Sequence, residues 1–143
     1  MTDGTVRCWG WNNYGQLGDG TTTQRNTPAT VSGLSSATAV AAGAWHTCAL
    51  LGDGTVRCWG WNNYGQLGDG TTTQRNTPVT VSGLSGATAI ATGRWHTCAR
   101  LTDSTVRCWG WNYFGQLGDG TMTQRNTPVA VSGLSGADRK SVV

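Results

Sequence analysis

The stretch C-W-G-W-N-N-Y-G-Q-L-G-D-G-T-T-T-Q-R-N-T-P runs from Cys8 to Pro28, and it recurs unchanged from Cys58 to Pro78. A third copy, with three substitutions, begins at Cys108. The copies are 50 residues apart, and the first 50 residues differ from the next 50 only at positions 1, 2, 29, 36, 40, 42, 44 and 50. A fixed period of this length indicates a repeat architecture in which each copy forms one supersecondary unit. Three near-copies predict a scaffold rather than one asymmetric catalytic site.

The composition favours an all-β protein. The 143 residues include 22 Gly and eight Trp, no Glu at all, and a single lysine, Lys140. Charged residues make up 12% of the chain, against about 25% in typical globular proteins. Such a glycine-rich, weakly charged chain is typical of many short strands joined by turns.

Charge and hydropathy exclude two classes of partner. The net charge is +3, but the arginines are spaced along the chain and interleaved with Asp, so no basic stripe for nucleic acid is predicted. No run of 18 apolar residues exists, so no transmembrane helix is predicted. We therefore expect neither nucleic acid nor a membrane as a partner.

Each 50-residue unit predicts four short antiparallel strands. Asp53-Gly54 lies between two β-like runs, which is a strong hairpin signal. Four such strands per unit are typical of a β-propeller blade, with the small-residue first strand nearest the axis and the tryptophans in the wedge between blades. Each blade has two apolar faces that only neighbouring blades can cover. In the third unit the expected strands are residues 87–93, 95–101, 106–110 and 129–132.

The strings G-R-W-H-T-C-A-R-L (93–101), V-R-C-W-G-W-N (106–112) and G-Q-L-G-D-G (115–120) resemble the regulator of chromosome condensation repeat, in a bacterial-type member. The resemblance covers residues 2–136 and implies a propeller of seven blades. The chain would then hold an arc of about 2.5 four-stranded blades. The expected division is a partial blade at 1–36, a blade at 37–86 and a blade at 87–136.

The two ends predict a fragment of a longer repeat protein. Met1 stands where the other copies have Leu51 and Leu101, so the sequence starts inside a repeated unit. The chain stops following the repeat after Ala137, and we assign residues 137–143 to a non-repeat tail. We expect this non-repeat tail to be artefactual sequence with no structural meaning.

The five cysteines predict one disulfide per blade. Cys48 and Cys58 are ten residues apart across a hairpin turn, as are Cys98 and Cys108, which places each pair on adjacent strands within bridging distance. The partner of Cys8 would precede this sequence. Buried, reduced cysteines are the alternative, and zinc binding is disfavoured because no C-x₂₋₄-C pair is present. Disulfides favour an extracellular or cell-surface protein, and reduced cysteines a cytoplasmic one.

Neither histidines nor acidic loops predict catalysis. His46 and His96 repeat in the same W-H-T-C context, which favours a structural role over a catalytic or metal-binding one. The G-D-G-T loops at 18–21, 68–71 and 118–121 each offer one carboxylate, fewer than calcium usually requires. No catalytic set can be assembled, so we expect a protein that is not an enzyme and has no metal or cofactor.

Differences between the copies suggest partner-binding residues. Tyr and Arg are favoured interface anchors, and loops can vary without disturbing the sheets. Neutral drift after recent duplication explains the same differences equally well. The candidates are Arg94, Trp95, Arg100, Tyr113, Phe114 and Met122.

The sequence thus predicts a non-catalytic, protein-binding propeller scaffold. The fold family that the sequence resembles includes a secreted β-lactamase inhibitor. The resemblance therefore implies that an exported propeller could capture a protein partner. The alternative is a guanine-nucleotide exchange factor for a small GTPase at chromatin, as for the namesake of the family. Near-identical copies offer no asymmetric loop for that activity. Because an arc leaves two apolar blade faces open, the isolated chain is expected to self-associate.

Overall fold

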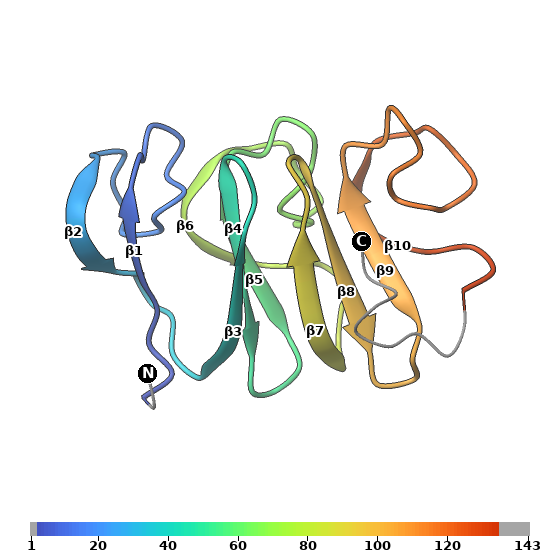
Figure 1. Ribbon diagram of the computed structural model, residues 1–143, viewed down its shortest axis with the longest axis horizontal. Coiled ribbons are helices and arrows are strands. Elements are labelled where there is room, and N and C mark those ends of the chain that lie inside the picture. The colour runs from blue at the N-terminus through green and yellow to red at the C-terminus, as the bar shows by residue number, and fades with distance from the viewer. Residues whose placement is uncertain (1–2, 135–143) are drawn as a thin grey trace.

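The computed structural model describes residues 3–134, which form antiparallel strands and no helix. The prediction of an all-β chain built from four-stranded antiparallel blades is confirmed. A two-stranded sheet, β1-β2, precedes two four-stranded sheets in the orders β3-β4-β5-β6 and β7-β8-β9-β10, and the three sheets stand side by side (Figure 1). The non-repeat tail at 137–143 lies outside the described residues. The strands are β1 (Arg7–Gly10), β2 (Arg25–Thr30), β3 (Ala37–Ala42), β4 (His46–Leu51), β5 (Val56–Gly60), β6 (Arg75–Thr80), β7 (Ala87–Thr92), β8 (His96–Leu101), β9 (Val106–Gly110) and β10 (Arg125–Ala130).

The first strand of the last blade packs against the preceding blade, as its small side chains predict. Strand β7 contacts both β3 and β4 of the preceding blade. Its sequence, A-T-A-I-A-T, leaves room for this close approach. The last strand lies at the opposite edge of each sheet. Pro78 on β6 is tolerated there because an edge strand does not need every main-chain N–H for pairing.

The fourth strand differs from the prediction. It was expected at residues 129–132, but β10 begins at Arg125 and ends at Ala130. Arg125 pairs with Gly110 and Val129 pairs with Cys108, so four residues of β10 span only two of β9 through a register irregularity. The three residues N-T-P thus lie opposite Trp109 alone, in a turn-like stretch that the bulge accommodates at a sheet edge.

A repeated hydrogen-bonded clasp joins neighbouring blades. The indole Nε1 of Trp59 and the hydroxyl of Thr47 both donate to the main-chain oxygen of Gln16 in the preceding unit, each at 2.9 Å. Trp59 is fully buried. In the next interface Trp109 and Thr97 donate to the oxygen of Gln66, at 2.9 and 3.0 Å. We call this three-residue arrangement the interblade clasp.

The prediction that the tryptophans fill the wedge between blades holds for Trp59 and Trp109, the first Trp of the second and third C-W-G-W, whereas Trp9 in the first copy is 61% exposed. Trp59 is buried in the wedge, whereas Trp61 is half-exposed in the loop that follows β5. Gly60 separates them with φ of 110°, and a Cβ there would lie 2.6 Å from the main-chain oxygen of Trp45. This glycine conformation turns the chain out of the strand, so that the two indoles reach different surfaces.

Two disulfides close the central hairpins of the complete blades. Cys48 is joined to Cys58, and Cys98 to Cys108, with a Cα–Cα distance of 4.1 Å in each pair. Each pair occupies directly opposed positions in the ladder, as the ten-residue spacing indicates. Cys8 on β1 is a free cysteine.

The hairpin turn of the last blade carries a strained residue that substitution should relieve. Ser104 has φ of 65° where the preceding blade has Gly54 with φ of 82°. The left-handed conformation costs a non-glycine residue about 1–2 kcal/mol. Replacement by glycine removes this cost, but glycine loses more conformational entropy on folding, so the net gain in stability is smaller. We expect Ser104→Gly to raise the free energy of unfolding by about 0.5–1 kcal/mol, measured by urea denaturation.

Gly54→Ser is the matched control. It should lower the free energy of unfolding, because a Cβ at Gly54 would also lie 3.1 Å from the main-chain nitrogen of Gly86. A loss of stability in Ser104→Gly would contradict the strain assigned to this turn.

Candidate binding surface

Aromatic side chains form a continuous row along one face of the arc. This face is made by the β3–β4 and β7–β8 turns and by the long loops after β1, β5 and β9, at the top in Figure 1. Neighbouring ring centroids lie 4.9–6.5 Å apart. We call the row the aromatic belt; it consists of Trp11, Tyr14, Trp45, Trp61, Tyr64, Trp95, Trp111, Tyr113 and Phe114.

Each blade contributes rings from two connections. Trp45 lies in the turn before β4, and Trp61 and Tyr64 lie in the loop after β5. The main-chain nitrogen of Trp61 donates to the oxygen of Trp45 at 2.9 Å, which fixes the two connections together. Their indoles then meet edge to face, with centroids 5.0 Å apart and planes at 84°. Backbone hydrogen bonding therefore sets the geometry of the rings.

The belt crosses the borders between blades. Tyr14 of the first unit lies 5.4 Å from Trp45, and Tyr64 lies 5.6 Å from Trp95 of the next blade. The equivalent indoles of Trp45 and Trp95 are themselves 6.0 Å apart. Such pairs contribute about 0.5–1.5 kcal/mol each beyond the burial of their area. The rings thus form one surface that spans all three units.

The two ends of the belt are its most accessible parts. Trp11 is 44% exposed at one end, and Tyr113 and Phe114 are 65% and 75% exposed at the other. Between them, Arg94 holds its guanidinium 4.6 Å above the ring of Trp95, a cation–π contact. Rigid, amphipathic aromatic rings with an arginine are the side chains that protein interfaces favour.

The long loops that carry the belt are stapled from within. The side-chain amide of Asn62 donates to the main-chain oxygens of Thr71 and Thr73, both at 3.0 Å, and its carbonyl accepts from the nitrogen of Leu67. Asp69 accepts from the nitrogen of Thr71 and from Arg75 Nε, at 3.0 and 3.1 Å. The same contacts recur in the other two loops. The belt therefore rests on ordered loops.

The hydrogen bonds within each loop explain the role of the Asp in each G-D-G-T sequence. Burial would raise the pKa of Asp119, but hydrogen bonds from Thr121, Arg125 and Asn112 outweigh it and lower that pKa to about 2. The carboxylate is thus ionised and already held by protein donors. Within residues 3–134 no group of three or more His, Cys, Asp or Glu side chains is placed to hold a metal ion.

Four of the six residues suggested by sequence differences meet on the belt. Trp95, Tyr113 and Phe114 are belt members, and Arg94 stacks on Trp95. The tryptophans among the remaining belt residues are identical between copies, so differences between copies do not point to them. Their spacing, one Trp in each G-x-W-H and one after each C-W-G, was the signal that could have identified them.

The other two suggested residues lie away from the belt. Arg100 stands on β8, five residues beyond Trp95, which is about 16 Å along a strand. Met122 is 73% exposed on the stapled loop, between Thr121 and Thr123, whose main-chain oxygens accept from Asn112.

His46 lies in the interblade contact rather than on the belt. Its Nε2 is 2.9 Å from the hydroxyl of Thr97, and that hydroxyl itself donates to Gln66. The imidazole must therefore carry a proton on Nε2 and donate it to that hydroxyl. Burial, with a smaller contribution from His96, lowers the pKa of His46 to about 3. This geometry gives His46 a structural role.

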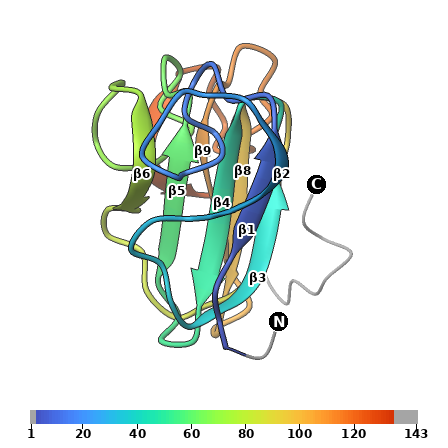
Figure 2. The same ribbon diagram turned by 90° about the vertical axis from the view of Figure 1, so that its left-hand side faces the viewer.

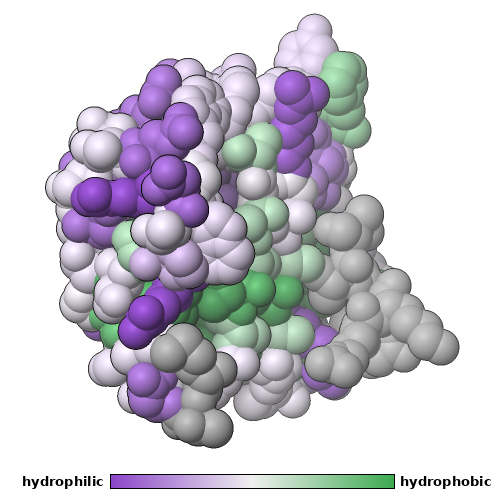
Figure 3. All heavy atoms as spheres, turned by 60° about the vertical axis from the view of Figure 1, so that its left-hand side comes forward, coloured by the Kyte–Doolittle hydropathy of each residue, from purple (hydrophilic) through white to green (hydrophobic). Residues whose placement is uncertain are grey.

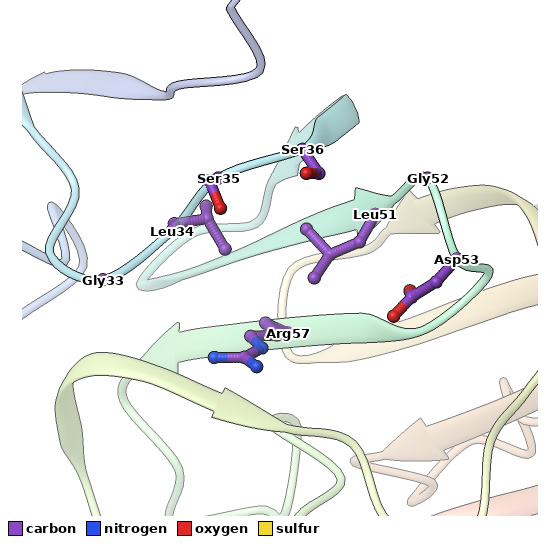
Figure 4. Close-up of a pocket in the computed structure, with 8 residues that line it drawn as sticks. All are labelled: Gly33, Leu34, Ser35, Ser36, Leu51, Gly52, Asp53 and Arg57. Carbon is purple, nitrogen blue, oxygen red and sulfur yellow. The ribbon is translucent and has the colours of Figure 1, made fainter.

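A hollow lies at the end of the strands opposite to the aromatic belt. Figure 4 shows Leu34 and Leu51 pointing into it, with Arg57 from β5 on the far side and Asp53 at the hairpin turn. Its volume is about 500 Å³. The Nε of Arg57 is buried there without a hydrogen-bond partner in the described part of the chain.

Comparison with known families explains the repeat. The family model of the regulator of chromosome condensation (RCC1) repeat matches residues 3–50, 53–100 and 103–143, and a second model of this repeat matches 37–66 and 87–116. The chain belongs to the RCC1 repeat family. The boundaries of the RCC1 repeat fall at the hairpin turns, so each repeat spans the second half of one blade and the first half of the next. No match is found among curated protein sequences.

Solved structures share this RCC1 fold. Human WBSCR16 superposes with a TM-score of 0.82 at 26% identity, over 95% of this chain and 36% of that protein. RCC1 (Prp20) from yeast, bound to Kap60, gives 0.74 at 25% identity, over 95% and 32%. Prp20p from Saccharomyces cerevisiae gives 0.76 at 19% identity, over 89% and 34%. The chain thus spans about a third of the length of each of these proteins. Separately, none of the described segments is a helix with the length and hydropathy to cross a membrane.

The buried histidine makes stability depend on pH. Folding lowers the pKa of His46. As the pH falls below about 6.5, this histidine therefore becomes protonated in the unfolded chain while it stays neutral in the folded chain. The free energy of unfolding should be independent of this residue above pH 7. Between pH 6.5 and 4.5 it should fall by up to about 1.4 kcal/mol per pH unit for each such histidine.

His46→Gln should flatten this dependence, measured by urea denaturation at several pH values. The window stops at pH 4.5 because Asp side chains begin to titrate below it. His96→Gln is the matched control, since burial lowers the pKa of His96 in the same direction and it occupies the same position in β8. Parallel pH profiles for wild type and His46→Gln would contradict the neutral, buried imidazole.

Proposed function

We propose that this chain is part of a non-catalytic, protein-binding propeller scaffold and that the aromatic belt is its contact surface. One observation carries the proposal: nine aromatic side chains form one row across three units, on loops that their own side chains staple. A preformed surface costs little conformational entropy on binding.

The relatives support protein binding as the general role. Prp20p has been studied for its binding to Gsp1p and histones, and yeast RCC1 has been crystallised with Kap60. RCC1-type repeats thus provide surfaces for protein partners. We expect the loops of this chain to determine which partner it binds. Since the chain spans about a third of these proteins, we infer that its blades belong to a larger ring.

We further propose that the protein works outside the cytoplasm, at the cell surface or in the extracellular space. Both described hairpins of this type, β4–β5 and β8–β9, carry a disulfide, and Cys8 on β1 is free. Structural disulfides persist in oxidising compartments and are rare in the cytosol.

A second candidate function is nucleotide exchange on a small GTPase. The binding of Prp20p to Gsp1p favours it, although the 19% identity to that protein supports the fold alone. Exchange requires loops that differ from blade to blade, and here the loops after β1 and β5 are identical in sequence. Accelerated release of labelled nucleotide from a small GTPase would support this candidate over the scaffold.

The redox state of the cysteines tests the location. We expect intact protein, alkylated without reduction, to carry a label at Cys8 alone, with two peptides retaining the Cys48–Cys58 and Cys98–Cys108 links. Mass spectrometry before and after reduction measures this directly. Full alkylation of all five cysteines in protein purified without reductant from an exporting host would contradict export through an oxidising compartment.

The belt can be tested against residues that the chain itself offers as controls. We propose to select binders from a displayed library of bacterial secreted-protein fragments and to measure their affinity. Trp11→Ser combined with Phe114→Ser should weaken binding at least about tenfold, because exposed aromatic anchors dominate interface energy.

Arg100→Leu and Met122→Thr are the matched controls, since the first two units carry Leu50 and Thr22 at these positions. Both should leave the affinity within about twofold of wild type, because neither residue lies on the belt. Binders that lose affinity in the controls and keep it in the belt variant would refute the belt as the contact surface.

A further inference from the structure

The hollow at the β4–β5 turn lies where the first unit meets the second blade. Figure 2 shows the connection from β2 to β3 crossing in front of β4 and β5 to the end of the molecule where this turn lies. The main-chain nitrogen of Gly52 in the turn donates to the oxygen of Ser36 in the connection, at 2.9 Å. We call the hollow of about 500 Å³ between them the turn pocket; it is lined by residues 33–36 and 51–53 and by Arg57.

The turn pocket does not depend on where the sequence begins. The main-chain nitrogen of Ala37 donates to the oxygen of Gly4 at 3.0 Å, and the equivalent bond in the next interface is 2.9 Å. Leu34 is 6% exposed, as is its equivalent Leu84. Figure 3 shows a band of hydrophobic residues across the middle of this side of the arc, but the pocket lining includes none of the large hydrophobic side chains that are exposed within residues 3–134.

Two substitutions distinguish the turn pocket from its equivalent in the next interface. Ser36 and Gly52 are replaced there by Gly86 and Thr102, while the main-chain bond between turn and connection stays at 2.9 Å. A Cβ at Gly86 would lie 3.1 Å from the hydroxyl of Thr102, so this threonine reaches from the turn to the connection. A Cβ at Gly52 would meet nothing closer than 3.7 Å. Glycine at the turn therefore leaves space that threonine fills in the last blade.

Arg57 brings an unsatisfied donor to the pocket. Its Nε is buried and has no hydrogen-bond partner in the described part of the chain. The ion pairs within residues 3–134 all lie in the three long loops, so no carboxylate of this range neutralises the guanidinium of Arg57 at contact distance. A buried donor without an acceptor is costly, and the fork of a guanidinium matches a carboxylate. The pocket therefore favours a ligand with a carboxylate.

The remaining lining indicates what else this ligand should carry. Leu34 and Leu51 point into the pocket, and Asp53 stands at its edge (Figure 4). The hydroxyl and the main-chain nitrogen of Thr55 donate to Asp53 Oδ1, at 2.6 and 3.0 Å. These bonds, with a smaller contribution from Arg57, lower the pKa of Asp53, so its carboxylate is ionised. A negative charge at the edge disfavours a doubly charged phosphate and favours a donor or a positive group beside an apolar one.

We propose that the turn pocket binds the carboxylate of an α-amino acid with an apolar side chain, either as the free amino acid or as the last residue of a peptide. The carboxylate would pair with Arg57, the side chain would contact Leu34 and Leu51, and the amino or peptide N–H would face Asp53. The volume lies in the range of small-molecule sites. The pocket is at the opposite end of the strands from the aromatic belt, so the two sites are independent.

The test titrates the full chain with four probes in isothermal calorimetry: leucine, N-acetyl-leucine, leucinamide and inorganic phosphate. At least one of the two carboxylates should bind with one site per chain, and leucinamide and phosphate should bind at least about tenfold more weakly. Tighter binding of leucine identifies the free amino acid as the ligand, and tighter binding of N-acetyl-leucine identifies a chain terminus. The NMR resonance of the Arg57 Nε–H should shift on binding, because that proton gains an acceptor.

The next interface supplies the matched variant. Gly52→Thr combined with Ser36→Gly reproduces the pair found there, and Ser36→Gly also removes a positive φ of 63°. This chain should fold as wild type does and bind at least about tenfold more weakly, as should Arg57→Gln. Binding of neither carboxylate, equal binding of leucinamide or phosphate, or unchanged affinity in the Gly52→Thr, Ser36→Gly chain would overturn the proposal.

Discussion

The interblade clasp is the interaction on which the structure depends. One main-chain oxygen, that of Gln16 or Gln66, receives both an indole N–H and a threonine hydroxyl from the next blade. A buried donor left without its acceptor costs about 1–3 kcal/mol, so loss of this oxygen would leave two such groups unsatisfied. The clasp therefore ties the burial of Trp59 and Trp109 to the correct placement of the neighbouring blade.

The loop that closes the clasp also carries the candidate binding surface. Gln66 contributes its main-chain oxygen to the clasp, while its side chain accepts a hydrogen bond from the nitrogen of Tyr64 on the belt. The Asn62 and Asp69 staple holds the remainder of the same loop. The candidate contact surface and the packing of neighbouring blades consequently depend on the same loop.

Identical sequence does not give identical environment at the end of the arc. Trp9 and Trp59 occupy the same position in the repeat, yet one is largely exposed and the other buried. The difference arises from neighbours alone, since a blade face is covered only by the adjacent unit.

The 50-residue period and the Asp-Gly hairpins determined the all-β fold, the four-stranded blades and the pairing of Cys48 with Cys58, because these depend on contacts that are local within one unit. The same reasoning placed the fourth strand too late, since the bulge at N-T-P exists only through pairing with β9. Sequence differences led to Tyr113 and Phe114 but not to Trp45 or Trp61. Only the tertiary structure decided that Trp59 and Trp109 are buried while Trp61 and Trp111 join the belt, because the burial depends on a main-chain oxygen of the preceding unit, Gln16 for Trp59 and Gln66 for Trp109.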